Sequence, residues 1–147
     1  MKMITRDTDY AIRTLTCIAG KKEKIVTVRD LTEELEMPKA YLRRVLQILN
    51  KKGILQSFKG RGGGFKLIRD PENITVFNLV VIFQGPFHLT EHLFKGRVCP
   101  YINTCYLKEK LDHMEGYVAG ELKGITIASL MNNGFEKEGP GSVPEIV

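Results

Sequence analysis

Two cysteines and two histidines lie close together in the second half of the chain, in a segment with several turn-forming residues. Cys99 and Cys105 are separated by five residues, and His88 and His92 precede them. Thiolates and imidazoles bind zinc and iron, and two neighbouring thiols can also form a reversible disulfide. The residues alone leave three interpretations open: a metal site, a thiol switch, or reduced thiols with no sensing role.

The first half of the chain offers a different chemistry, because positive charge is concentrated there. Residues 1–69 contain 16 Lys or Arg and 7 Asp or Glu, a net charge of +9. Residues 70–147 contain 6 and 10 of these, a net charge of −4, so the whole chain carries +5. This asymmetry favours a polyanion as the partner of the N-terminal half.

Apolar residues at helical spacing predict three helices in that basic half. The predicted helices cover residues 4–19, 28–35 and 38–52. Thr27 and Asp30 have the spacing of a capping box at the start of the second helix. The third helix is expected to bury one apolar face and to present arginines on the other.

A hairpin follows the three helices. Two short extended runs, 54–59 and 64–68, are joined by Gly60-Arg61-Gly62-Gly63, and glycines readily supply the positive φ angles of a tight turn. This order of elements predicts a winged helix-turn-helix, with arginines of the third helix in the major groove and the hairpin at the minor groove. The candidate DNA-binding residues are Lys39, Tyr41, Arg43, Arg44, Lys59, Arg61, Gly62 and Gly63.

The glycine loop is not expected to bind a nucleotide. A phosphate-binding glycine loop leads into the start of a helix, whereas this one leads into the extended run Phe65-Lys66-Leu67-Ile68. No Gly-Lys-Ser or Gly-Lys-Thr sequence is present either. DNA is therefore the expected phosphate-containing partner.

The second half is divided into a short helix, a loop and a long helix. Thr75 is expected to cap an apolar helix that ends near Gln84, and residues 85–101 form the predicted sensor loop. The predicted boundaries are 1–84 for the DNA-binding domain, 102–131 for a dimerisation helix region and 132–147 for a tail expected to be disordered. One stripe of the long helix contains Leu107, Leu111, Met114, Val118 and Leu122.

Several segments together resemble one family. They are Thr8–Arg13, Tyr41–Leu46, Ser57–Leu67, Pro71–Val76 and Cys105–Leu107. Over residues 1–131 the chain is similar to the Rrf-type winged-helix transcriptional regulators, whose members include iron–sulfur, nitric oxide and cysteine-metabolism regulators. The resemblance implies a mainly α fold with a small β-hairpin wing, in a bacterial transcription factor that forms a homodimer through its long C-terminal helix.

The resemblance also bears on the cofactor. Cluster-binding members commonly have three cysteines in the loop, whereas Leu93 stands here at the expected position of one of them. The resemblance implies an iron–sulfur cluster, [2Fe–2S] or [4Fe–4S], at Cys99 and Cys105. It suggests His92 and the partner chain's Asp9 as the remaining ligands.

Two positions depart from the family pattern. Arg43 stands where the family often has Glu, which changes the base that this position would read and leaves the operator sequence open. Lys108 stands where one relative has a histidine ligand, so this position offers no ligand here. The third cysteine, Cys17, is expected to be a small core residue of the first helix.

These observations predict a homodimeric cytoplasmic regulator, a repressor, that binds a pseudo-palindromic DNA operator under control of a cluster or redox state at Cys99 and Cys105. The alternatives are a thiol-switch or cofactor-free regulator and a winged-helix adaptor that contacts proteins. An enzyme is not expected, because no Ser/His/Asp order, paired carboxylates or metal-hydrolase motif is present. A membrane span is not expected, because no apolar run is long enough.

Overall fold

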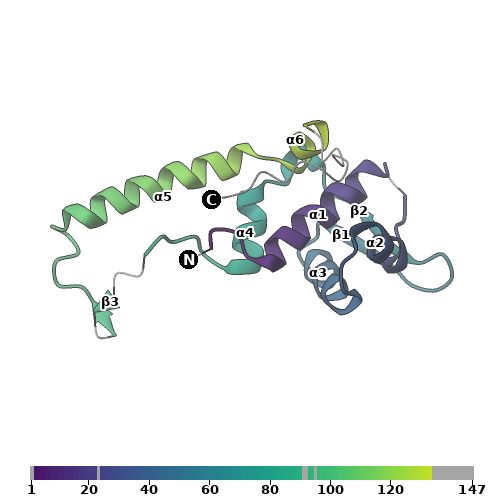
Figure 1. Cartoon of the computed structure of the whole chain (residues 1–147), viewed down its shortest axis with the longest axis horizontal. Helices are drawn as coiled ribbons and strands as arrows, with labels where there is room; N and C mark the ends of the chain where they lie inside the picture. The colour runs from purple at the N-terminus through teal and green to yellow at the C-terminus, as the bar shows by residue number, and fades with distance from the viewer. Residues whose placement is uncertain (1, 23, 91–92, 95, 134–147) are drawn as a thin grey trace, which may run out of the picture.

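The computed structural model describes residues 2–22, 24–90, 93–94 and 96–133. The described part is mainly helical, with two small antiparallel hairpins. Figure 1 shows a cluster of helices and one hairpin, from which the long helix α5 (Tyr106–Gly124) projects as an arm. The predicted fold class, a winged helix-turn-helix with a long C-terminal helix, is confirmed.

Three helices form the helix-turn-helix part: α1 (Arg6–Gly20), α2 (Val28–Leu35) and α3 (Lys39–Lys51). The predicted capping box of α2 is present, with the Asp30 amide donating to the Thr27 hydroxyl at 3.1 Å and the Thr27 amide donating to the Asp30 carboxylate at 3.3 Å. These bonds satisfy two amides at the helix start and fix where α2 begins.

The wing is a hairpin of β1 (Leu55–Phe58) and β2 (Gly64–Leu67). The strands are antiparallel, with Phe58 opposite Gly64. Phe65 also pairs with Val26 in the turn before α2, through two amide–carbonyl bonds of 2.9 Å. This pairing requires a glycine at position 64, because a Cβ atom there would lie 2.4 Å from the carbonyl oxygen of Val26.

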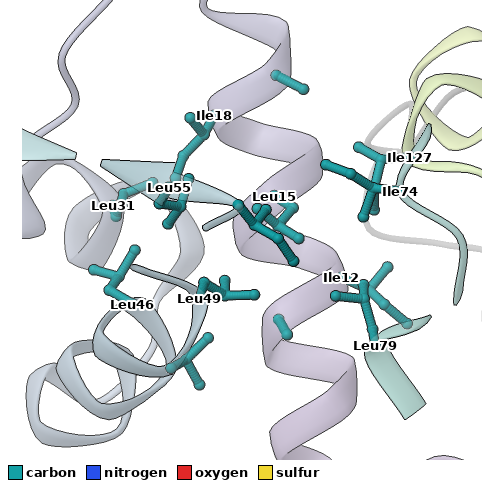
Figure 2. Packing of buried hydrophobic residues seen from close by; sticks show 14 of the residues in the cluster. Ile12, Leu15, Ile18, Leu31, Leu46, Leu49, Leu55, Ile74, Leu79 and Ile127 are labelled. Atoms are coloured by element: carbon teal, nitrogen blue, oxygen red, sulfur yellow. The ribbon is translucent and has the colours of Figure 1, made fainter. Parts of the chain in front are cut away.

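The hydrophobic core surrounds α1. In Figure 2 the α1 side chains of Ile12, Leu15 and Ile18 lie in the middle of the cluster. Side chains from α2, α3 and β1 lie on one side of them, and side chains from the second half of the chain lie on the other. The labelled residues of these two groups are Leu31, Leu46, Leu49 and Leu55, and Ile74, Leu79 and Ile127. This shared core fixes the recognition helix α3 relative to α4.

The second half adds η1 (Pro71–Asn73), α4 (Val76–Gln84), α5 and α6 (Ile127–Asn132). Thr75 caps α4 as expected. The starts of α4 and α6 are joined by backbone bonds of 2.9 Å, from the Val76 amide to the Ile125 carbonyl and from the Ile127 amide to the Ile74 carbonyl. The C-terminal end of α5 is thereby anchored to the helix cluster.

Some expectations differ from the structure. Helix α1 begins at Arg6 rather than at residue 4, and within the predicted region 102–131 α5 begins only at Tyr106, after Cys105 as N-cap. The expected loop 85–101 contains two short paired strands, β3 (Leu93–Phe94) and β4 (Arg97–Val98). Residues 134–147 of the expected disordered tail lie outside the described residues. Among the described helices, none is long and apolar enough to cross a membrane.

Candidate nucleic-acid interface and sensor segment

Helix α3 separates its apolar and polar side chains on two faces. Leu42, Val45, Leu46 and Leu49 are buried, each at 1% exposure or less. The predicted DNA-binding side chains of this helix are all exposed: Lys39, Tyr41, Arg43 and Arg44. An amphipathic helix anchored in this way presents a rigid row of side chains to solvent, as a helix that reads DNA must do.

One edge of the exposed α3 face contacts the start of α1. The Tyr41 ring meets the Tyr10 ring edge to face, with centroids 6.2 Å apart. The Arg6 guanidinium lies 4.8 Å from the Tyr41 ring centroid and donates to the Tyr41 hydroxyl at 3.1 Å. One turn further along α3, Arg44 forms an ion pair of 3.7 Å with Asp7.

These contacts change the expected roles of two α3 residues. Tyr41 and Arg44 point along the edge that faces α1, so each already has a partner within the chain. No ion pair or hydrogen bond of the Arg43 side chain is found among the described residues, and it is exposed. The sequence pattern gives no signal for Arg6, because helical spacing alone does not reveal that the start of α1 lies beside α3.

The wing lies along the other edge of α3. A hollow of about 370 Å³ between them is lined by Gln47 and Asn50 of α3 and by Ser57 and Lys59 of the wing, among others. Lys59 and Arg61 are exposed at the tip of the hairpin. Of the cations predicted to contact DNA, Lys59 lines this hollow, whereas those of α3 and Arg61 do not.

The backbone conformation of the wing requires glycine at several positions. Gly60 and Gly62 have φ angles of 90° and 72°, in the region that side chains disfavour. At Gly63 a Cβ atom would lie 2.4 Å from the Phe58 carbonyl oxygen. Gly62 and Gly63 thus shape the turn that carries Arg61, and their contact with DNA stays a prediction.

Cys99 and Cys105, the cysteines predicted to act in sensing, flank a short run of turns at the outer end of α5. Cys105 is the N-cap of α5, and its Sγ atom accepts a hydrogen bond of 3.4 Å from the Lys108 amide. The Cys99 carbonyl accepts from the Ile102 amide at 3.1 Å, which begins the turns between them. Both thiols are free and partly exposed.

The other candidate ligands do not join these thiols within the described chain. His92 lies outside the described residues. His88 is exposed, with Nδ1 3.1 Å from a Glu115 carboxylate oxygen, and the other oxygen of Glu115 accepts from the Leu89 amide at 3.0 Å. His88 therefore helps attach the loop to the middle of α5. In the described part of the chain, no three His, Cys, Asp or Glu side chains gather in a way that could hold a metal.

Asp9 is far from the cysteines of its own chain. It forms an ion pair of 2.9 Å with Arg13 on α1. Figure 1 shows α1 within the helix cluster, whereas Cys105 lies at the outer end of α5. A helix of 19 residues is roughly 28 Å long at 1.5 Å per residue. Asp9 and Cys105 could meet only through a second copy of the chain.

Helix α5 leaves two residues of its predicted apolar stripe exposed, whereas Leu111 and Val118 are half-buried. Leu122, at the anchored end, is 5% exposed, whereas Leu107 is 65% and Met114 is 53% exposed. Tyr106 and Tyr117, on the adjoining part of the helix, are 69% and 68% exposed. Large apolar side chains grouped on one exposed surface are typical of an interaction surface.

Cys17 differs from the other two cysteines. It is half-buried on α1 and packs against the core, as the sequence predicts. Burial, a hydrogen bond from the thiol to Glu34 and the charge of that carboxylate raise the pKa of Cys17 to about 12. Because the thiolate is the reactive form, Cys17 is poorly suited to redox or metal chemistry.

Fold and surface together define a winged helix-turn-helix DNA-binding protein. The chain belongs to the Rrf2 family, described as iron-dependent transcriptional regulators, whose family pattern matches residues 4–133. A protein of Aquifex aeolicus named as an HTH-type transcriptional regulator is 29% identical over 133 residues, which cover 88% of this chain and 92% of that protein. The HTH-type transcriptional regulator NsrR of Bacillus subtilis is 26% identical over 132 residues, covering 88% and 90%.

Solved structures show the same fold. CymR, the global cysteine regulator of B. subtilis, matches with a TM-score of 0.76 and 20% identity, over 91% of this chain and 99% of that one. IscR of T. potens matches with a TM-score of 0.68 and 20% identity, over 90% and 88%. The named relatives are transcriptional regulators rather than enzymes, and this chain is a DNA-binding transcriptional regulator of the same family.

Proposed function

We propose that the protein is a homodimeric bacterial repressor whose affinity for a pseudo-palindromic DNA operator is set by an iron–sulfur cluster at Cys99 and Cys105. The observation that carries the DNA-binding part is the set of exposed cations on α3 and on the wing, two elements that together line one hollow. Because its partner is chromosomal DNA, we place the protein in the cytoplasm.

In this proposal α3 reads the major groove. Arg43 is the foremost candidate for base contact, since arginine can bond guanine in a bidentate manner and this side chain has no ion-pair partner among the described residues. Lys59 and Arg61 of the wing contact phosphates or the minor groove. Arg44 must exchange its ion pair with Asp7 for a DNA contact, so its net contribution is smaller.

The dimer is proposed to form through α5. The exposed side chains of Leu107 and Met114 lie on one stripe of this helix, and burial against the same stripe of a second copy would remove them from water. A two-fold axis would make the contact isologous and would present two recognition helices to one face of the duplex. This symmetry is why the operator is expected to be pseudo-palindromic.

The donor set supports a cluster shared between protomers. Cys99 and Cys105 supply two thiolates, whereas cluster irons in proteins commonly take four protein ligands in total. His92 of the same loop and Asp9 of the second protomer are the proposed remaining ligands. The cluster would supply a redox-active group, and non-cysteine ligands would raise its reduction potential above that of an all-cysteine cluster.

Ligands from two chains would connect sensing with DNA binding. Asp9 lies on α1, the helix whose start contacts Tyr41 and Arg44 of α3. Binding of Asp9 to the partner's sensor loop would hold the DNA-binding domain of one protomer against α5 of the other. This contact would fix the separation of the two recognition helices. The cluster can control DNA binding only if the dimer with the cluster bound and the dimer without it differ in their affinity for the operator.

The test is anaerobic purification followed by visible spectroscopy, iron and sulfide assays and binding to a random-sequence duplex pool, before and after exposure to oxygen. The variants are Cys99→Ala with Cys105→Ala, and Cys17→Ala as matched control. We expect a coloured wild type and Cys17→Ala, a colourless double variant, and DNA binding that changes when the colour is lost. A colourless wild type whose DNA binding responds to reversible oxidation would replace the cluster with a thiol switch.

A further inference from the structure

Each edge of helix α3 is flanked by positively charged side chains that belong to other elements of the fold. On one edge these are Lys59 and Arg61 of the wing, described above. On the other edge is Arg6, from the first turn of α1, which is exposed and stacked on Tyr41. Figure 1 shows the start of α1 beside α3.

Arg6 differs from the other arginine of α1 in its charge balance. Arg13 is paired with Asp9 at 2.9 Å, so its charge is neutralised locally. The neighbouring carboxylate, Asp7, pairs with Arg44. Arg6 has no carboxylate partner among the described residues, and the only hydrogen bond found for its side chain there goes to the neutral Tyr41 hydroxyl. Arg6 is therefore an exposed cation held in place by contacts that do not neutralise it.

The contacts of Arg6 also reduce its freedom. The guanidinium is held over a ring and by one hydrogen bond, which leaves most of its N–H groups directed at solvent. A fixed guanidinium loses less conformational entropy when it binds an anion than a freely rotating side chain does. The ring that holds it belongs to the first turn of α3, so its position is tied to that helix.

A helix in the major groove lies between two phosphate backbones, one along each edge of the groove. In helix-turn-helix proteins the recognition helix enters the groove while other parts of the domain contact the backbone. Resting on the proposed function, we infer that Arg6 binds a DNA phosphate on the edge of the groove opposite the wing. In this inference the Arg6–Tyr41 pair fixes the position of the recognition helix along the DNA groove.

The test measures duplex binding of the full-length protein as a function of salt. A phosphate contact is independent of sequence, so the probe is a short duplex of arbitrary sequence. The variants are Arg6→Ala, Arg6→Lys and, as matched control, Lys123→Ala. Lys123 is also an exposed cation on an aromatic ring of the same chain, 4.7 Å from the Phe77 centroid, but it lies at the end of α5.

We expect Arg6→Ala to reduce the slope of log K against log salt by about 0.9 for each protomer bound. Arg6→Lys should retain the slope, because the charge is kept, and Lys123→Ala should behave as wild type. An unchanged slope in Arg6→Ala, or a loss that Arg6→Lys does not restore, would overturn the assignment of Arg6 while leaving the proposed function intact. Absence of duplex binding by the wild type would instead overturn the proposed function and this inference with it.

Discussion

Gln84, the last residue of α4, accepts a hydrogen bond of 2.7 Å from the hydroxyl of Thr8 on α1, although 76 residues separate them. The same amide oxygen accepts from the Thr5 backbone amide at 3.0 Å, and the amide nitrogen donates to the Met3 carbonyl at 3.2 Å. Thr8 is fully buried. One side chain therefore joins the start of α1 to the end of α4, where the loop predicted to act in sensing begins.

Replacing Gln84 tests this junction. Gln84→Leu would remove the acceptor that the buried Thr8 hydroxyl and the Thr5 amide share, so we expect the free energy of unfolding to fall by about 1–3 kcal/mol. Gln84→Glu retains the acceptor and loses only the bond to Met3, so a smaller loss is expected. Urea unfolding of both variants measures the difference. Equal stability of Gln84→Leu and wild type would show that the junction is not a stabilising one.

Sequence alone could predict the helix-turn-helix and the wing, because their signals are local. The capping pair Thr27 and Asp30, the buried stripe of α3 and the glycines of the hairpin all act within a few residues, and the structure contains each of them. Thr75 likewise caps α4 through Asn78, three residues later. Caps, helix faces and tight turns depend on residues that are close in the sequence, so the spacing of residue types predicts them.

Long-range relationships could not be predicted in this way. Arg6 meets Tyr41 across 35 residues, and Gln84 meets Thr8 across 76. Such pairs depend on how helices pack around the core of α1, which periodicity does not specify. The short strands β3 and β4 were overlooked because two residues each are too few to show an alternating pattern.

The DNA contact can be tested by comparing a base contact with a backbone contact. We expect Arg43→Ala to weaken binding to a preferred site by about 1–3 kcal/mol and to relax sequence preference at one position. Arg61→Ala should weaken binding more evenly across sequences. Selection of sites from a random duplex pool, followed by titration, measures both effects. Unchanged affinity and preference in both variants would contradict docking through α3 and the wing.

Assembly can be tested at Met114. In one chain Met114 is 53% exposed, so Met114→Asp should leave the fold of the isolated chain unchanged. If the stripe of α5 forms the dimer, the buried carboxylate should raise the dimer dissociation constant by about 100-fold or more. Glu109→Lys, an exposed charge change on the opposite face of α5, is the control and should remain dimeric. Sedimentation velocity distinguishes the species, and a monomeric wild type at micromolar concentration would contradict the dimer.

Cys17 gives a prediction that depends on pH. With its pKa raised to about 12 by burial and by Glu34, the thiol stays protonated in the folded protein well above the ordinary thiol pKa. The folded state therefore binds this proton more tightly than the unfolded chain, and the associated stability declines as pH rises from the ordinary thiol pKa towards 12. Alkylation at about pH 8 should be slow at Cys17 and rapid after unfolding. Glu34→Gln should accelerate it, as peptide mass spectrometry can measure.

The proposed cross-chain ligand can be tested with mixed dimers. If a site takes its thiolates from one chain and Asp9 from the other, two defective chains can complement each other. One chain carries Asp9→Ala, and the other carries Cys99→Ala with Cys105→Ala. In the mixed dimer, the cysteines of the first chain meet the intact Asp9 of the second, so one complete site is formed. If both ligands came from one chain, neither chain of this dimer would hold a complete site.

The two chains would carry different affinity tags, so that only mixed dimers are recovered after anaerobic reconstitution. We expect one cluster per mixed dimer by iron and sulfide assay, as resistant to chelator as in the wild type, with two clusters in the wild type and none in the dimer of the cysteine variant. The Asp9→Ala homodimer should lose its cluster at lower chelator concentration than the wild type, because its sites lack one ligand. Full retention in that homodimer would remove Asp9 from the ligand set. A mixed dimer without any cluster, beside a competent wild type, would contradict the shared site, since Asp9 lies far from Cys105 within its own chain.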